Sequence, residues 1–254
     1  MLGLLGVPAL ADERDLCPER PGLDTPPCIV DAGRVLAEVG AIDWTRDRQT
    51  GVRTDTVLIG DALLRLGLTD RVEGQVGWTT YGHVRTRDAR GMSSQSGIGD
   101  VTAALKFGLV HPDGSGTSIA LKPYVTLPAG GRAIGAGTWG AGLLVPVSFD
   151  LGSGLQLALT PELNALPDQD RSGRHLAFGS TAGVQGRISE AVGFAIEVQL
   201  IRDRDPSGHS TQALSEVSFA WQPGKNVQFD MGAVAGLNRA SPDLELIAGV
   251  SRRF

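Results

Sequence analysis

Charged and polar residues recur inside strand-like apolar runs of this 254-residue chain. In FAIEVQLIR, residues 194–202, Glu197 stands among apolar residues that occupy every second position. A buried carboxylate without a partner is costly, so Glu197 is expected to face water or a cation. Other runs carry similar residues in the phase opposite their apolar face: Glu38, Asp61, Arg65, Glu73, Lys106, Lys122, Tyr124, Glu162, Arg187, Glu216, Asp230 and Glu245.

Two interpretations of these residues stay open. In a channel they would form an electrostatic constriction that selects solutes by charge and hydrogen bonding. In a narrow barrel filled by side chains they would form a structural network of paired charges. Carboxylates outnumber cations in the set, and this bias would favour cationic or neutral solutes over anionic ones.

Catalytic and metal-binding motifs are not evident in the sequence. There is no P-loop, dinucleotide-binding fingerprint or zinc-protease motif. A lipid-facing Ser–His pair needs both residues on one face, and the neighbours His209 and Ser210 point to opposite faces of a strand. The Asp-rich segments 167–173 and 203–209 contain arginines, which compete with calcium for the carboxylates. We therefore expect solvated loops and predict no catalytic residue, metal site or cofactor.

The N-terminal region predicts export. Residues 1–11, MLGLLGVPALA, resemble the apolar region and cleavage site of a secretory signal. The two cysteines, Cys17 and Cys28, follow in CPERPGLDTPPC, and an oxidising compartment favours one small disulfide loop between them. Residues 12–32 are thus expected to form a periplasmic segment that leads into the fold.

Alternation dominates from residue 33 onward. Apolar residues recur at every second position over about ten residues before each turn cluster, which is the period of β-strands. Twelve runs show this pattern: 33–44, 52–68, 72–85, 97–110, 116–127, 138–151, 154–166, 174–188, 191–202, 210–222, 226–238 and 243–254. Short turns alternate with longer polar connections such as TRDRQTG and TRDARGMSSQS, a pattern typical of outer-membrane barrels.

Such strands fit either a soluble barrel with an apolar interior or a transmembrane barrel with a wet lumen. Three features favour the membrane. The runs are long enough to cross a bilayer at a tilt, their polar face is rich in small residues, and the chain ends on Phe254 in phase with the last apolar face. A terminal aromatic residue of this kind resembles the signal that barrel assembly machinery reads. We predict an all-β, up-and-down antiparallel transmembrane barrel of about 12 strands over residues 33–254.

Composition excludes several other classes. Hydrophobic residues make up 41% of the chain and charged residues 20%, and no apolar stretch is long enough for a membrane-spanning helix. The net charge of −5 argues against nucleic-acid binding, which favours a basic surface.

Four strand patterns suggest a family. SGIGDVTAALKFGLV (96–110), ALKPYVTLPAG (120–130), NVQFDMGAVAGLN (226–238) and DLELIAGVSRRF (243–254) resemble the outer-membrane family named for the meta-pathway of phenol degradation. The resemblance implies a barrel in a Gram-negative outer membrane, in contact with its lipids, that passes small aromatic or other hydrophobic compounds.

The sequence therefore predicts a passive channel or transporter without cofactor or energy coupling, and not an enzyme. Two alternatives stay open: a closed-lumen barrel with a structural or surface-interaction role, and an outer-membrane lipid hydrolase.

Overall fold

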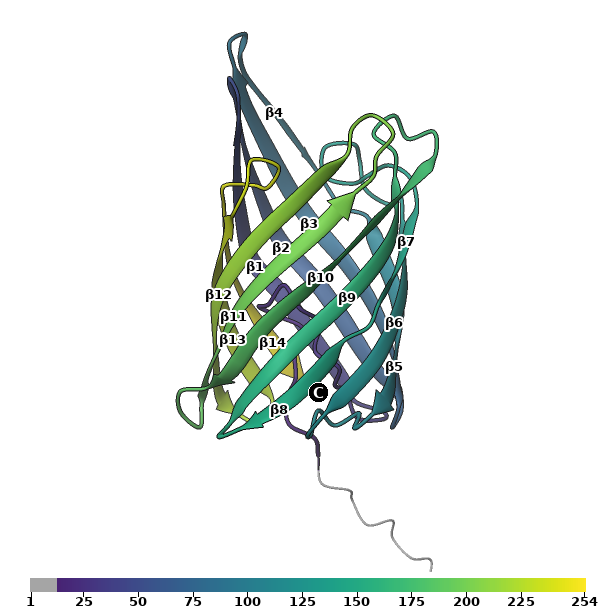
Figure 1. Cartoon of the computed structure of the whole chain (residues 1–254), viewed down its shortest axis with the longest axis vertical. Coiled ribbons are helices and arrows are strands. Elements are labelled where there is room, and N and C mark those ends of the chain that lie inside the picture. Colours follow the sequence, from purple (N-terminus) through teal and green to yellow (C-terminus); the bar gives the residue numbers. More distant parts are fainter. Residues whose placement is uncertain (1–12) are drawn as a thin grey trace, which may run out of the picture.

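The computed structural model describes residues 13–254 and contains fourteen β-strands (Figure 1). The strands are β1 (Val35–Gln49), β2 (Val52–Thr69), β3 (Val72–Asp88), β4 (Gly91–Gly97), β5 (Val101–Val110), β6 (Ser118–Leu127), β7 (Gly140–Leu144), β8 (Val147–Gly152), β9 (Leu155–Pro167), β10 (Arg174–Arg187), β11 (Val192–Asp203), β12 (Ser210–Gly224), β13 (Val227–Gly236) and β14 (Leu244–Arg253). Among the described residues, no helix is long and apolar enough to cross a membrane.

These strands form a closed antiparallel barrel with twelve crossings. Two crossings are interrupted, because β4 and β5 both pair with β3, and β7 and β8 both pair with β6 and β9. Pairing of β14 with β1 and of β9 with β10 closes the ring. The predicted up-and-down barrel of about 12 strands is confirmed, and the strand bounds lie close to the twelve predicted runs.

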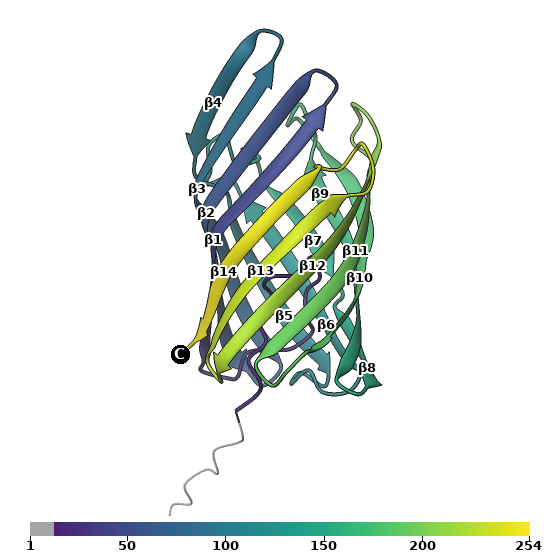
Figure 2. The ribbon, with the colours of Figure 1, turned by 90° about the vertical axis from the view of Figure 1, so that its left-hand side faces the viewer.

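The two ends of the barrel differ. The end that we call the turn end carries the C-terminus, the described start of the chain and the connections 70–71, 111–117, 153–154, 188–191 and 225–226. The opposite, loop end carries the longer connections 128–139, 168–173, 204–209 and 237–243. Two further connections predicted as loops extend the sheet instead, as the hairpins β1–β2 and β3–β4, which project beyond the other strands (Figure 2).

The β1–β2 hairpin shows why a polar segment continues as strand. Arg46 Nε lies 3.0 Å from Asp55 Oδ1, and Arg53 Nε lies 2.7 Å from Asp55 Oδ2. Gly51 adopts φ +77° in the connecting turn, a conformation that favours glycine. Charge pairs and a tight turn therefore keep in register a segment that composition alone marks as a loop.

The barrel is apolar outside and polar inside. Ile196 and Met231 are 54% and 63% exposed on the outer surface, whereas Glu38 and Arg65 are completely buried in the interior. A lipid-facing apolar surface around a polar lumen is the arrangement of transmembrane barrels. The alternation of each strand thus places its carboxylates and cations in the lumen, where they meet the N-terminal segment.

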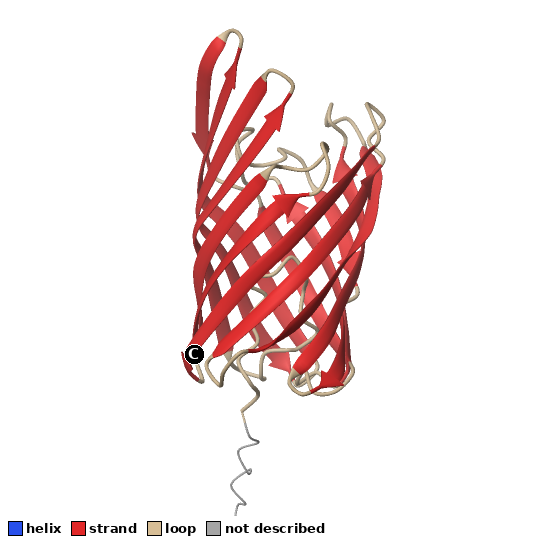
Figure 3. Cartoon of the chain, turned by 60° about the vertical axis from the view of Figure 1, so that its left-hand side comes forward, coloured by secondary structure: helices blue, strands red, loops and turns tan. Residues whose placement is uncertain are grey.

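Residues 13–32, which we call the plug, lie inside the barrel near the turn end (Figures 1 and 3). The segment that was expected to lead into the fold from the periplasm thus runs within the lumen over its described residues. The cause is the lumen itself, because the plug backbone supplies hydrogen-bond donors to carboxylates that the strands bury, such as Glu38 and Glu197. The predicted signal residues 1–11 lie outside the described part of the chain.

Candidate functional site

Three cations and three carboxylates form a neutral network on one side of the lumen. We call this set the balanced cluster; its members are Glu19, Glu38, Arg65, Glu73, Lys106 and Lys122. Arg65 on β2 lies at its centre, with Nη1 3.1 Å from Glu38 Oε1 and Nε 2.9 Å from Glu73 Oε1. Lys106 Nζ lies 2.9 Å from Glu19 Oε1 of the plug. Because Arg65, Glu38 and Glu73 are fully buried, each charge depends on the others for its solvation.

The balanced cluster also holds the plug in place. Glu38 accepts hydrogen bonds from the backbone amides of Glu19 and Arg20 at 2.8 and 3.0 Å. Arg65 donates to the carbonyl oxygens of Cys17 and Cys28 at 2.8 and 3.2 Å. These two cysteines form a disulfide with a Cα–Cα distance of 6.5 Å. The strand side chains therefore bind both ends of the disulfide loop.

A second side of the lumen, which adjoins the balanced cluster on β1 and β2, is acidic. We call it the acidic wall; its carboxyl groups come from Asp43 on β1, Asp61 on β2, Glu197 on β11, Glu216 on β12, Asp230 on β13 and Glu245 on β14. Glu197 and Glu216 are directly opposite each other in the β11–β12 register. Among residues 13–254, the cation that pairs with this wall is Arg20 of the plug, 3.2 Å from Asp230.

Neutral hydrogen-bond donors pair with only some of the carboxylate oxygens in the acidic wall. Glu197 accepts the backbone amides of Leu23 and Asp24 at 2.7 and 3.0 Å, and Thr79 donates to Asp61 at 2.7 Å. Neither carboxylate oxygen of Glu216 accepts a hydrogen bond from a described residue, although the side chain is buried. The wall therefore has an excess of acceptors, which attracts cations and polar neutral groups.

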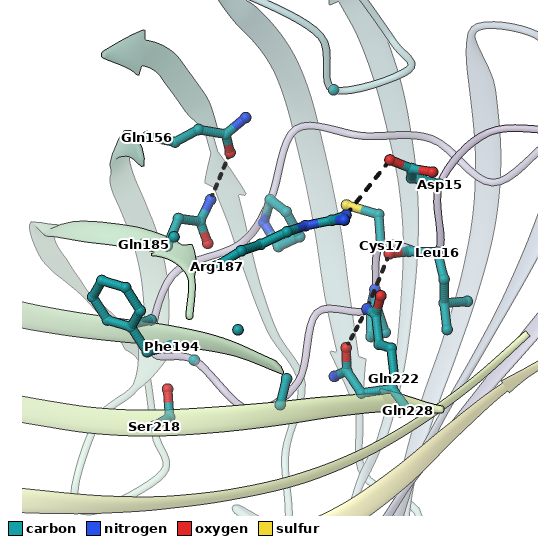
Figure 4. A pocket seen from close by; sticks show the side chains of 18 of the residues that line it. Asp15, Leu16, Cys17, Gln156, Gln185, Arg187, Phe194, Ser218, Gln222 and Gln228 are labelled. Atoms are coloured by element: carbon teal, nitrogen blue, oxygen red, sulfur yellow. Dashed lines mark hydrogen bonds and ion pairs between the residues drawn. The ribbon is translucent and has the colours of Figure 1, made fainter. Parts of the chain in front are cut away.

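A cavity of about 480 Å³ lies between the plug and the strands that carry part of the acidic wall (Figure 4). Its strand side includes Gln156, Gln185 and Glu197, and its plug side includes Asp24. Gln185 donates to Gln156 at 3.2 Å. Amides and carboxylates thus share the lining with apolar residues such as Phe194 and Phe219, and they offer hydrogen-bond partners to a small polar solute or to water.

The residues predicted from alternation occupy these places in the lumen. Glu38, Arg65, Glu73, Lys106, Glu197, Glu216 and Asp230 are buried, and Asp61, Lys122, Tyr124, Glu162 and Glu245 are partly exposed. Tyr124 donates to Asn164 at 2.8 Å, and Asn164 donates to Glu162 at 2.6 Å. Arg187 lies apart from the other predicted residues at the turn end, 3.6 Å from Asp15. Whether these residues select solutes stays a prediction.

Sequence reasoning missed the plug residues Glu19, Arg20 and Asp24. Each contributes a charge or a backbone amide to the lumen from the segment between the cysteines. The available signal was the pattern of charges between two cysteines, which could have indicated a segment that pairs with lumen side chains.

A serine and a histidine meet on the outside of the barrel, where sequence reasoning found no such pair. His83 Nδ1 lies 2.7 Å from Ser96 Oγ, and Tyr81 Oη lies 3.2 Å from the same oxygen. A catalytic serine needs a base that a third group orients. Within residues 13–254, no carboxylate forms a hydrogen bond or ion pair with His83. The pair does not form a complete triad.

Residues that could hold a metal lie at the loop end, where β10 and β11 meet the connections 168–173 and 204–209. Ligand atoms of Asp168, His175 and Asp205 lie within 4.8 Å of one another. Hydrogen bonds from the Ser207 hydroxyl and amide hold the pKa of Asp205 below its ordinary value. This carboxylate is therefore ionised at neutral pH.

Solved structures of low sequence identity share the fold. The NanC porin aligns with a TM-score of 0.53 and 9% identity, over 84% of this chain and 99% of the porin. The KdgM porin gives a TM-score of 0.52 and 11% identity, over 84% and 98%. The beta domain of the Bordetella autotransporter BrkA gives 0.54 and 14%, over 88% and 100%. These are outer-membrane barrel folds, and no curated protein matches the sequence.

A family model matches the whole barrel together with part of the plug. It covers residues 19–254 and is described as "Putative MetA-pathway of phenol degradation". The match begins at Glu19, which is the plug residue that pairs with Lys106 and Lys122. The family indicated by the four strand patterns is thereby confirmed, and the chain belongs to this phenol-degradation family of β-barrel proteins.

Proposed function

We propose that this barrel is a passive channel in the outer membrane of a Gram-negative bacterium for small neutral or cationic solutes. The fold of the porins NanC and KdgM supports the location. The family description supports phenol-like aromatic compounds among the neutral solutes. Transport needs no cofactor and no chemical reaction on the solute.

The observation that carries the proposal is the charge difference between the two sides of the lumen. The balanced cluster pairs three cations with three carboxylates. The acidic wall offers six carboxyl groups and one described ion pair, Arg20–Asp230. A barrel with a purely structural interior would be expected to pair its charges on both sides, because unpaired buried carboxylates are costly. An unbalanced wall is favourable where it contacts water or passing cations.

The plug sets the route that a solute must take. It fills the turn end of the lumen on the side of the balanced cluster, and the cavity of about 480 Å³ lies on the other side, next to Glu197. We infer that solutes pass along the acidic wall, either beside the plug or after the plug loosens from Glu197. Anions would be repelled along this path.

A swelling assay in liposomes tests the proposal with three solutes of similar size: glucose, protonated glucosamine and gluconate. The channel should admit glucosamine and glucose faster than gluconate. Replacing Glu197 and Glu216 by glutamine should reduce the discrimination. Absence of flux for all three solutes, in the wild type and in a variant with a loosened plug such as Arg65→Ala, would contradict the channel.

A closed-lumen barrel with a structural or surface-interaction role is the second candidate. The observation that favours it is the depth at which the plug is bound, because Cys28 and Val30 of the plug are only 2% and 7% exposed. The swelling assay separates the two candidates, since a closed lumen gives no flux for any solute. We also propose that the barrel assembly machinery recognises Phe254, the last residue of the given sequence.

A further inference from the structure

Four side chains converge at the loop end of the barrel and belong to neither the balanced cluster nor the acidic wall. We call them the loop-end cluster: Asp168 in the β9–β10 connection, His175 at the start of β10, Asp203 at the end of β11 and Asp205 in the β11–β12 connection. Two connections that are separated by strands β10 and β11 in the sequence thus meet at one imidazole ring. We propose that Asp168, His175 and Asp205 form a binding site for a divalent transition-metal ion of the zinc type.

The distances suit a tetrahedral metal ion. His175 Nδ1 lies 3.0 Å from Asp168 Oδ1 and 3.4 Å from Asp205 Oδ2. Zinc binds nitrogen and carboxylate oxygen at about 2.0–2.2 Å, so that neighbouring ligand atoms of a tetrahedral site lie roughly 3.3–3.6 Å apart. The two carboxylates and the imidazole therefore need only small shifts to share one ion. An imidazole with carboxylates favours zinc over calcium or magnesium, which prefer oxygen ligands alone.

The imidazole of His175 is buried among the three carboxylates of the cluster. His175 is only 9% exposed, and its Nε2 atom has no hydrogen-bond partner among the described residues. Nε2 nevertheless lies 3.2 Å from Asp203 Oδ1. A histidine that binds a metal through one ring nitrogen commonly donates its other N–H to a carboxylate. Asp203 lies in this orienting position. Nδ1 forms a hydrogen bond with Asp168 Oδ1 at 3.0 Å; with the ring proton on Nε2, toward Asp203, the Nδ1 lone pair and the two carboxylates are free to bind one cation.

The arginines of the two loops do not neutralise the cluster. Arg174 lies over the Trp139 ring, with Cζ 4.3 Å from the ring centroid, and Arg204 lies over Phe178 at 5.1 Å. Within residues 13–254, neither arginine nor Arg171 forms an ion pair with the cluster carboxylates. The sequence analysis expected the arginines of segments 167–173 and 203–209 to compete with calcium for the carboxylates; in the structure Arg171 and Arg204 leave the cluster carboxylates without an arginine partner among residues 13–254.

Neighbouring backbone holds the two ligand carboxylates in position. Asp205 Oδ2 accepts the amide of Gln169 at 2.7 Å, which ties the β11–β12 connection to the β9–β10 connection. A side chain at Gly173 would place its Cβ 2.4 Å from Asp168 Oδ2, so glycine at this position leaves room for the carboxylate. The site is thus arranged by the fold, and a bound ion would clamp the two connections together.

Calorimetric titration of the folded, chelator-treated full-length protein with Zn²⁺ at neutral pH tests the site. We expect one Zn²⁺ per chain in the wild type. Asp203→Asn should weaken binding about 10- to 100-fold, the effect typical of a residue that orients a ligand, and His175→Gln or Asp168→Asn should weaken it further. Excess Ca²⁺ should not displace the ion.

Asp170→Asn is the matched control, because it removes a carboxylate from the same loop. Asp170 accepts hydrogen bonds from the amide and hydroxyl of Ser172, both at 2.8 Å, and lies outside the cluster. The Asp170→Asn variant should bind Zn²⁺ with the same affinity as the wild type. Circular dichroism checks that each variant is folded, and the visible absorption of bound Co²⁺ reports tetrahedral coordination in the wild type if a variant misfolds.

Two results would overturn the proposal. One is the absence of Zn²⁺ binding to the folded wild type, which would mean that an imidazolium alone bridges the carboxylates. The other is equal binding by Asp168→Asn, His175→Gln and Asp170→Asn, which would mean adventitious binding elsewhere on the surface.

Discussion

The balanced cluster and the acidic wall both hold the plug through backbone amides and ion pairs, but they differ in charge balance. On the balanced side, Arg65 and Lys106 bind plug carbonyl oxygens and Glu19 through charge. On the acidic side, Glu197 binds the plug through two backbone amides. The first side is neutral when all its groups are ionised, and the second is not. One side of the lumen therefore stabilises the bound plug with a neutral network of ion pairs. The other side keeps carboxylates that form no ion pair with a described residue.

The largest expected effect is from breaking the balanced cluster. Arg65→Ala leaves Glu38 and Glu73 buried without their cation, and removal of one partner from a buried ion pair costs about 3–5 kcal/mol. We expect a loss of this order in the free energy of unfolding, measured by urea titration in detergent micelles. Arg187→Ala is the control, because its pair with Asp15 is exposed at the turn end and should contribute little. Equal losses in both variants would contradict the cohesive role of the cluster.

The second effect concerns the disulfide. Cys17 and Cys28 are 11 residues apart, and closing a loop of this size stabilises a fold by about 2–4 kcal/mol. Replacing both cysteines by serine should loosen the plug and raise the conductance of the barrel in planar bilayers. Treating the wild type with a reductant should reproduce the change, whereas the serine variant should not respond to it. If neither the serine substitutions nor the reductant changes the conductance, the plug stays bound without the disulfide.

A third prediction applies one substitution to both sides. Glu73→Gln on the balanced side weakens charge-assisted hydrogen bonds from Arg65 and Val30, which are worth about 1.5–3 kcal/mol each, so stability should fall. Glu216→Gln on the acidic side removes repulsion from Glu197, its neighbour in register, so stability should stay the same or rise by less than about 1 kcal/mol. Melting temperatures of the two variants measure the contrast. If Glu216→Gln lowers the melting temperature as much as Glu73→Gln does, the carboxylates of both sides contribute equally to stability, and the contrast between the two sides is contradicted.

The smallest effect is expected where the plug joins the barrel. A Cβ at Gly67 would lie 2.0 Å from the carbonyl oxygen of Asp31, whereas a Cβ at Gly74 would meet only Leu68 at 3.6 Å. Gly67→Ala should therefore shift the last residues of the plug and make them more accessible to protease, and Gly74→Ala should not. Limited proteolysis from the turn end compares the two variants. Similar cleavage rates would show that the plug adapts without strain.

The barrel could be predicted from the sequence because each strand carries its own signal. Alternation places Glu197 and Ile196 on opposite faces without reference to any other strand, and this local rule also assigned Arg65 and Glu216 to the lumen. The hairpins beyond the barrel were missed, since the charged segment around Arg46 has the composition of a loop and becomes a strand only through its pair with Asp55.

The plug and the loop-end cluster could not be predicted in the same way. The amide of Leu23 meets Glu197 across 174 residues of sequence, and no local pattern encodes such a contact. The loop-end cluster depends on where Arg174 and Arg204 point, and both stack on aromatic rings instead of pairing with the nearby aspartates. Side-chain direction in loops is set by tertiary neighbours, so composition alone suggested mutual neutralisation.

Ion selectivity tests the central claim most directly. The reversal potential of the purified barrel would be measured in a planar bilayer across a KCl gradient, for the wild type and for Glu197→Gln/Glu216→Gln. Conduction along the acidic wall predicts a wild type that prefers K⁺ over Cl⁻ and a double variant in which this preference is reduced. A barrel that prefers Cl⁻, or that does not conduct even after the disulfide is reduced, would contradict it.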